Sequence, residues 1–235
     1  MSRSAIKRIC VLGVTGLLTA GCTGPLSTLE PAGPAAASIA LLWWIMLAGS
    51  VVLFAIVIGL FTLAFYRPAW LAGISARNWI LHGGITMSSV VILLLLVAAF
   101  VLGERLVARP LADPPLAVQA NGRMWVWEFS YPSVEGPSLT TNVLHIPAGE
   151  IVDVRVTSSD VIHSFWSPRL AGKIDAVPGH ENVVRLTAER PGTYRGVCAE
   201  FCGVGHTQMH FTVIAHPPEA YEQALADAIA AETTE

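Results

Sequence analysis

The sequence predicts a two-helix transmembrane hairpin over residues 38–103, followed by an all-β Greek-key sandwich over residues 116–216. Two long stretches, 31–66 and 78–103, contain no Asp, Glu, Lys or Arg. A chain of 235 residues has no core large enough to surround two such segments, so a buried soluble helix is a poor alternative. Beyond the second stretch the composition changes to short β-rich runs separated by turn residues, which is typical of a sandwich.

The N-terminus has the pattern of a secretory signal over residues 1–21. Basic residues precede an apolar run at 9–18, which is too short to cross a bilayer, and small residues precede Cys22. Cys22 resembles the lipid-modified cysteine of bacterial lipoproteins. However, Thr19 stands where such signals usually have Leu, which favours cleavage over lipidation. Residues 22–37 are expected to form an exported lead-in.

The two membrane helices are expected at about residues 38–66 and 79–102, each long enough to span the hydrocarbon core. The connection at 67–77 carries two Arg and no acid, which is typical of a cytoplasmic loop. The hairpin therefore points both ends outward. We expect a multi-pass protein of the bacterial inner membrane, with both termini and everything after Glu104 in the periplasm. His82 is the one ionisable side chain inside either helix.

Residues 104–115 read as a linker and residues 217–235 as a C-terminal helix and tail. Pro-Ser, Pro-Ala-Gly-Glu and Arg-Pro-Gly turns separate seven candidate strands. These are Leu116–Ala120, Arg123–Ser130, Ser138–Ile146, Ile151–Ser158, Asn182–Thr187, Gly192–Val197 and Met209–Ala215. On the second of them, Trp125, Trp127 and the two aromatic residues that follow at alternate positions are expected to share one face. A packed aromatic layer is the simplest reading of that face.

Twelve residues between the last two strands carry the chemistry. Cys198, Cys202, His206 and Met209 provide two thiols, an imidazole and a thioether, and His163 is the expected second imidazole from a neighbouring strand. Soft sulfur ligands with imidazole favour copper, and two thiolates can bridge two ions. A tetrahedral zinc site and a disulfide between the two cysteines are the alternatives.

The run Cys-x-Glu-x-Cys-x3-His-x2-Met, together with Asp-Val-Ile-His-Ser-Phe-Trp-Ser-Pro and Gly172-Lys-Ile-Asp-Ala-Val-Pro-Gly179, resembles subunit II of haem-copper cytochrome c oxidases. The resemblance implies a cupredoxin fold and a dinuclear, mixed-valence copper centre called copper A. Its ligands would be the side chains of His163, Cys198, Cys202, His206 and Met209, and the backbone carbonyl of Glu200.

The resemblance also implies a function. The chain would accept electrons from cytochrome c at copper A and pass them to haem in subunit I, where oxygen is reduced; subunit III is a further expected partner. Trp125 would be the point at which the electron enters. The carboxylate of Glu200 would face a magnesium or manganese site at the subunit interface.

The exported part of the chain is acidic. From Glu104 onward there are 16 acidic and 9 basic residues. An acidic face suits a basic donor such as a small cytochrome c, whereas net charge serves solubility without any partner. Asp160 and Asp175 are the acids closest in sequence to the metal motifs. The sequence contains no nucleotide-binding loop and no Ser, His and Asp in the order of a known catalytic triad. No nucleic-acid partner is expected.

The alternative functions differ in whether the copper ligands and the transmembrane hairpin are present in the sequence. A quinol oxidase subunit II has the same hairpin and sandwich but characteristically lacks the copper ligands. A soluble copper-A enzyme such as nitrous oxide reductase lacks the hairpin, and a membrane-tethered copper-binding module uses a single exchangeable copper.

Many subunit II relatives carry a carboxylate at the start of the second helix, where a proton path begins. Here no Asp or Glu occurs between Glu30 and Glu104, so that path is absent, lies in subunit I or uses His82.

Overall fold

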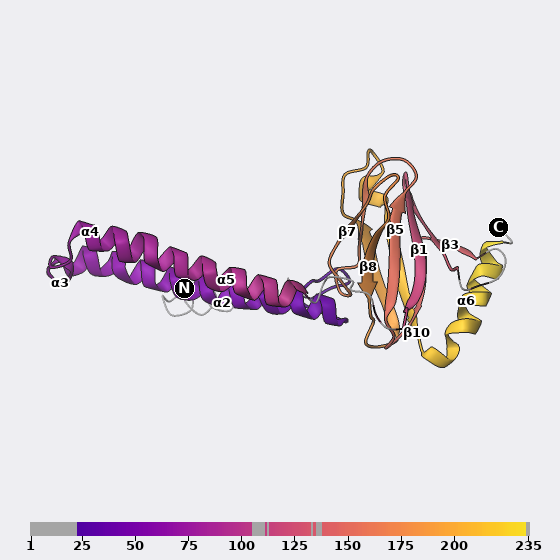
Figure 1. Ribbon diagram of the computed structural model, residues 1–235, viewed down its shortest axis with the longest axis horizontal. Helices are drawn as coiled ribbons and strands as arrows, with labels where there is room; N and C mark the ends of the chain where they lie inside the picture. Colours follow the sequence, from indigo (N-terminus) through magenta and orange to yellow (C-terminus); the bar gives the residue numbers. More distant parts are fainter. Residues whose placement is uncertain (1–22, 105–110, 112, 133, 135–137, 234–235) are drawn as a thin grey trace, which may run out of the picture. The chain divides into compact units, whose positions relative to one another are not determined.

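The computed structural model describes residues 23–104, 111, 113–132, 134 and 138–233. The predicted signal, Cys22 and most of the predicted linker lie outside the described residues. The chain divides into two compact units, Ser38–Leu106 on the one hand and Met1–Ala37 with Val107–Glu235 on the other. The first contains the apolar helices and the second contains the β-sandwich (Figure 1).

Two helices are long and apolar enough to cross a membrane, Pro34–Tyr66 and Ala76–Gly103. The elements are α2 (Pro34–Tyr66), α3 (Pro68–Leu71), α4 (Ala76–Asn78), η1 (Trp79–Thr86) and α5 (Met87–Gly103). Almost all of their large apolar side chains are exposed, as in a helix that faces lipid.

Both helices begin earlier than predicted, for identifiable reasons. Pro34 suits a first helical turn because its missing N–H needs no partner there, and the Gly33 carbonyl accepts the hydrogen bond of Ala37 N–H at 2.9 Å. The second helix begins after Ser75, whose hydroxyl accepts from Asn78 N–H at 3.3 Å and so caps it.

The β-domain is a sandwich of two five-stranded mixed sheets, which confirms the predicted fold class. One sheet has the order β3-β2-β1-β5-β8 and the other β4-β10-β9-β6-β7. The strands are β1 (Leu116–Arg123), β2 (Val126–Ser130), β3 (Leu139–Thr141), β4 (Val143–Pro147), β5 (Val152–Ser158), β6 (His163–Trp166), β7 (Ile174–Ala176), β8 (Asn182–Leu186), β9 (Gly192–Cys198) and β10 (His210–His216). Strand β1 runs parallel to β5, and β4 parallel to β10, as expected when strands return between sheets in a Greek key.

Two strand predictions need correction. The predicted strand 138–146 is two strands, one in each sheet, because the chain turns at Asn142. Asn142 has φ +56°, a conformation that Asn adopts more readily than most residues, and its Oδ1 accepts from Trp127 N–H at 2.9 Å. The predicted strand 123–130 begins only at Val126, so Trp125 lies in a turn. Strands β6 and β7 were not predicted.

The core lies between the two sheets and is centred on aromatic rings. Trp127 and Phe129 of β2 meet Phe165 of β6 and Phe211 of β10, with ring centroids 4.4–6.4 Å apart. Such edge-on and offset arrangements add to the free energy that apolar burial supplies. A Cβ at Gly196 on β9 would collide with the Phe211 ring, so the cluster requires glycine there.

The lead-in before α2 is attached to the sandwich. Ala32 N–H donates to the Arg169 carbonyl at 2.7 Å, and the Ala32 carbonyl accepts from Glu189 N–H at 2.9 Å. Gly33 lies so close to Thr187 that a side chain would meet its carbonyl. This segment therefore belongs to the β-domain rather than to a free tether.

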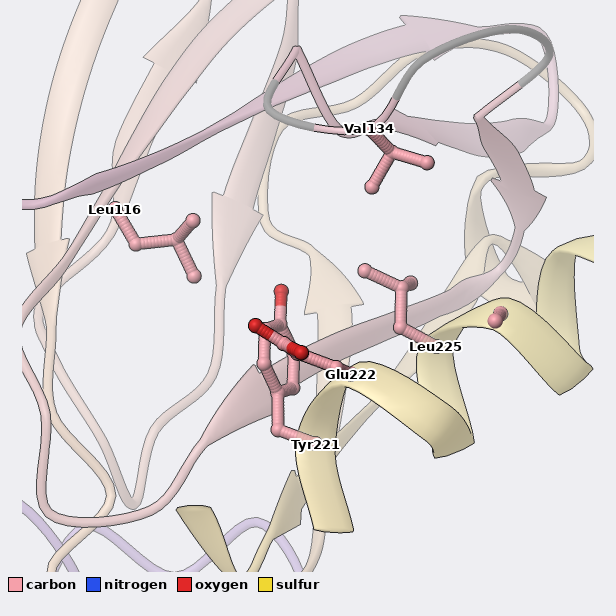
Figure 2. A pocket seen from close by; sticks show the side chains of 6 residues that line it. Leu116, Val134, Tyr221, Glu222 and Leu225 are labelled. Atoms are coloured by element: carbon pink, nitrogen blue, oxygen red, sulfur yellow. The ribbon is translucent and has the colours of Figure 1, made fainter. Parts of the chain in front are cut away.

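The predicted C-terminal helix is α6 (Pro218–Glu232), which buries Leu225 and Ile229 against the sandwich. The Glu232 carboxylate accepts from Thr141 N–H at 2.8 Å and so holds the end of α6 to β3. Between α6 and β1 lies a mainly apolar cavity of about 430 Å³ (Figure 2). Tyr221 of α6 points into it.

Candidate metal centre

Residues 199–209 connect β9 to β10 and are called the metal-motif loop. This is the position predicted from the sequence. Cys198 ends β9, and its N–H donates to the carbonyl of Met209, just before β10, at 2.9 Å. The next residue, Ala199, donates to Ser164 of β6 at 2.9 Å. These bonds close the loop at its base and set it beside the start of β6, where His163 lies.

The predicted side-chain ligands converge at this point in a consistent order. His163 Nδ1 is 3.8 Å from Cys198 Sγ, which is 3.8 Å from Cys202 Sγ. Cys202 Sγ in turn is 3.7 Å from His206 Nδ1 and 3.8 Å from Met209 Sδ. The Glu200 carbonyl oxygen lies 3.2 Å from Cys198 Sγ. The other four predicted ligands therefore surround the two cysteine sulfur atoms, so that all six are brought together.

The sulfur pair is buried and is not a disulfide. Both cysteines are free, and their sulfur atoms are almost twice a disulfide bond length apart. Burial, followed by the neighbouring Cys198 thiol, raises the pKa of Cys202 to about 12. Binding of a cation to sulfur requires the thiolate and releases this proton, so a buried Cys202 thiol with a raised pKa is compatible with a metal ligand.

The two imidazoles lie beside different sulfur atoms. His163 forms a compact group with Cys198 and Cys202, whereas His206 lies outside that group, next to Cys202. A single tetrahedral zinc ion would require all four donors around one point. One imidazole at each end of a sulfur pair instead provides a soft donor set for two copper ions.

His163 is held by Asp160, a contact that the sequence did not predict. His163 Nε2 is 2.8 Å from Asp160 Oδ1, and an ionised carboxylate can only accept, so Nε2 carries the hydrogen and Nδ1 faces the sulfur atoms with its lone pair. Burial works against the charged form of Asp160, but hydrogen bonds from Met124 N–H, His163 and Val161 N–H lower its pKa to about 2. The carboxylate is therefore ionised at neutral pH. An Asp three residues before a ligand His is the sequence signal that could have found it.

Because Gly122 has no side chain, it leaves room for the imidazole of His163. A Cβ at Gly122, in β1, would lie 3.0 Å from the His163 imidazole. The Trp127 ring also meets His163 edge-on, with centroids 6.1 Å apart. The orientation of this ligand is thus set by the core as well as by Asp160.

Trp125 lies over the metal-motif loop rather than on the face of Trp127. The predicted shared face holds for Trp127, Phe129 and Tyr131, which are all fully buried. It is wrong for Trp125, which occupies the β1–β2 turn and is 40% exposed. The Trp125 indole N–H donates to the Cys202 carbonyl at 3.0 Å. A Cβ at Gly205 would collide with the indole ring, so the loop needs glycine beneath it. The residue predicted to receive the electron therefore touches a predicted ligand directly.

The other predicted acids form an exposed cluster. The Glu200 carboxylate lies 3.9 Å from Lys173 Nζ, which is 2.9 Å from Asp175 Oδ1. The Lys173 hydrogen bond lowers the pKa of Asp175. His82 lies in η1 of the helical unit.

Comparison with known proteins identifies close relatives. The family model of the periplasmic domain of cytochrome c oxidase subunit II matches residues 138–216. Cytochrome c oxidase subunit 2 of Alkalihalophilus pseudofirmus is 33% identical over 250 residues, covering 97% of this chain and 70% of the relative. Quinol oxidase subunit 2 of Bacillus cereus is 32% identical over 223 residues, covering 88% of this chain and 74% of the relative.

Other relatives match over shorter stretches. Four further proteins described as cytochrome c oxidase subunit 2, or probable subunit 2, match over about a third of their own length. Among solved structures, the periplasmic domain of subunit II of cytochrome oxidase of Bradyrhizobium japonicum is 27% identical. The match covers 50% of the present chain and 96% of the Bradyrhizobium chain, with a TM-score of 0.47.

Proposed function

Since the chain belongs to the cytochrome c oxidase subunit II family, we propose that it is the electron-accepting subunit of a haem-copper terminal oxidase and holds a dinuclear copper A centre. The observation that carries the proposal is the convergence of six donors: two cysteine sulfur atoms 3.8 Å apart, with two imidazoles, a thioether and a backbone carbonyl each 3.2–3.8 Å from one of them. The ligands are the side chains of His163, Cys198, Cys202, His206 and Met209, and the Glu200 carbonyl. When bound, the copper centre supplies one-electron redox chemistry.

The protein fixes the positions of these six donors. The hydrogen bond between Cys198 and Met209 closes the loop, Asp160 fixes the His163 ring, and the core packs on its other face. A donor set that is fixed before the electron arrives needs little rearrangement afterwards, and second-shell contacts of this kind tune the metal. Met209 Sδ, a weak ligand, lies beside Cys202 and is suited to adjust the potential rather than to hold the metal.

Trp125 is proposed as the point at which the electron enters. Its ring is partly exposed, and its N–H is bonded to the carbonyl of a metal ligand. A soluble donor can therefore approach one edge of the indole while the other edge contacts the copper loop. The donor we propose is a cytochrome c.

The remaining features of the proposal concern the complex. The two apolar helices anchor the chain in the inner membrane, with the copper domain and both termini in the periplasm and the two arginines of the connection in the cytoplasm. Electrons pass to haem in subunit I, and subunit III is a further partner. The exposed Glu200 carboxylate is proposed to face magnesium or manganese at the subunit I interface. His82 is proposed as the start of a proton path; unchanged turnover and proton pumping in His82→Ala would remove that role.

Quinol oxidation is the second candidate, because a quinol oxidase subunit 2 is similar over most of the chain. The donor set supports cytochrome c instead, since quinol needs no copper in this subunit. The test is to mix the oxidised complex with reduced cytochrome c or with a quinol. We expect cytochrome c to bleach the near-infrared band of copper A before haem is reduced. Reduction of haem by quinol with no copper band would contradict the proposal.

A further inference from the structure

A mainly apolar cavity separates part of α6 from the sandwich. Its volume is about 430 Å³, and it is lined by Leu116, Val134, Tyr221, Glu222, Leu225 and Ala226 (Figure 2). Cavities of roughly 300–1,000 Å³ with apolar walls and few polar groups are typical of sites for small molecules. Glu222 and Ala226 are exposed, so the cavity can be reached from solvent.

Tyr221 places a polar atom in this apolar space. It lies at helical spacing from Leu225 and Ile229, the two residues of α6 that are buried against the sandwich. Its hydroxyl points into the space bordered by Leu116, Val134 and Leu225 (Figure 2). The oxygen atom is buried and has no hydrogen-bond partner among the described residues. A buried hydroxyl without a partner is destabilising, so this donor indicates an acceptor that binds in the cavity.

The walls of the cavity favour an organic acceptor over water. A buried water molecule needs two to four polar partners. Of the side chains that line the cavity, only Tyr221 and Glu222 are polar. A dry apolar cavity of roughly 150 Å³ binds benzene, so on that scale this cavity has room for about ten to fifteen carbon atoms.

The charges around the hydroxyl select against an anion. Burial, followed by the neighbouring acidic groups of Tyr131, Glu150 and Glu222, raises the pKa of Tyr221. The hydroxyl therefore stays protonated and can donate a hydrogen bond. Helix α6 carries four acidic residues and no basic residue, so it would repel a carboxylate or a phosphate. An uncharged carbonyl oxygen provides the acceptor without this repulsion.

We propose that the cavity is a binding site for an uncharged, mainly apolar molecule of about ten to fifteen carbon atoms that carries a carbonyl oxygen. The phenol of Tyr221 donates to that oxygen, while Leu116, Val134 and Leu225 contact the apolar body. Because the ligand lies between α6 and β1, its binding holds α6 against the sandwich. None of the lining residues is a predicted metal ligand, so the inference does not depend on the proposed function.

Hydrogen exchange of the full chain, purified in detergent with its native partners, tests the site. The probes are 1-tetralone, which is an uncharged bicyclic ketone, tetralin, which has the same skeleton without the oxygen, and the anion 2-naphthoate. We expect 1-tetralone to protect the backbone amides of Pro218–Glu232 in a dose-dependent manner, and 2-naphthoate to give no protection at the same concentrations. Absence of protection by 1-tetralone, or equal protection by 2-naphthoate, would overturn the inference.

Tyr221→Phe isolates the hydrogen bond, because it keeps the ring and removes only the hydroxyl. At equal detergent concentration each probe enters micelles equally in the parent and the variant samples, so the ratio of their midpoints reports the site. We expect the midpoint to rise about tenfold for 1-tetralone and to change by less than about twofold for tetralin. Equal midpoints for 1-tetralone in parent and variant would contradict the proposal.

A matched pair of substitutions on α6 tests the location of the ligand. Ala226 lines this cavity, whereas Ala228 lines a separate cavity of about 300 Å³ beside Thr140 and His145. Ala226→Leu should abolish protection by both 1-tetralone and tetralin, because the larger side chain narrows the site. Ala228→Leu should match the parent. Binding that survives Ala226→Leu, or that is lost in both variants, would contradict binding in this cavity.

Failure of the proposed function gives a different result. If the parent binds 1-tetralone as expected but the purified protein holds no copper A, the function is wrong and the cavity site stands. If copper A is present but 1-tetralone gives no protection, only the cavity site is wrong.

Discussion

Trp125→Phe tests whether the electron enters where the indole touches the ligand loop. The substitution keeps an aromatic ring over the glycines of the loop and removes the N–H that donates to the Cys202 carbonyl at 3.0 Å. A hydrogen bond of this kind contributes about 1 kcal/mol to stability. We expect the free energy of unfolding to fall by about that amount and copper content to be unchanged.

Electron uptake should fall more than stability does. Without the N–H, the path from the ring to the copper loop has a through-space gap, and we expect uptake from reduced cytochrome c to slow about tenfold, equivalent to about 1.4 kcal/mol of activation free energy. Pre-steady-state mixing at equal copper loading measures this rate. Reduction by a small-molecule reductant, which does not need Trp125, should be unaffected.

Trp127→Ala is the control. Trp127 is fully buried among aromatic rings and against His163, so truncation should cost about 3–5 kcal/mol and release metal. If Trp125→Phe takes up electrons as fast as the parent, the relay role is wrong. If it loses copper as Trp127→Ala does, Trp125 is a structural residue.

Three further predictions follow from the structure. Cys202→Ser should abolish the near-infrared copper band, because a hydroxyl is a poor soft ligand, while membrane insertion measured by fractionation is retained; an intact band would end the copper A assignment. Asp160→Asn should weaken copper binding about 10–100-fold in a chelator competition, since the ring it orients loses its carboxylate; unchanged affinity would show that Asp160 is not needed to orient the ligand. His145 Nδ1 and His216 Nε2 are 2.8 Å apart, and burial followed by the neighbouring His216 lowers the pKa of His145 to about 4. Because the unfolded chain takes up this proton at higher pH than the native protein, stability is full above about pH 6.5 and should fall by about 3 kcal/mol as the pH drops to about 4. Denaturant unfolding of the parent and of His145→Gln checks this, and equal acid sensitivity in the two would contradict it.

The features predicted well were those with a strong local signal. The absence of charged side chains located both helices, and turn residues located most strands. The copper motif was recognised because its residue types are uncommon together and lie within twelve positions. Here local chemistry and tertiary structure agree.

The features missed depend on long-range contacts. Strand β6 is short and buried on both faces, so its residues do not alternate, and β7 has only three residues. The turn at Trp125 contains neither glycine nor asparagine, so nothing marked it as a hairpin turn. Asp160 is the exception, because it lies only three residues before His163, and its long-range contact is the hydrogen bond that it accepts from Met124 N–H.

The most direct test of the account is the metal content of the purified complex, measured together with electron spin resonance. Two copper ions per chain in a mixed-valence signal, in addition to the copper of subunit I, are predicted by one sulfur pair with an imidazole at each end. A single zinc or copper ion bound to this chain, or a disulfide between Cys198 and Cys202, would contradict it.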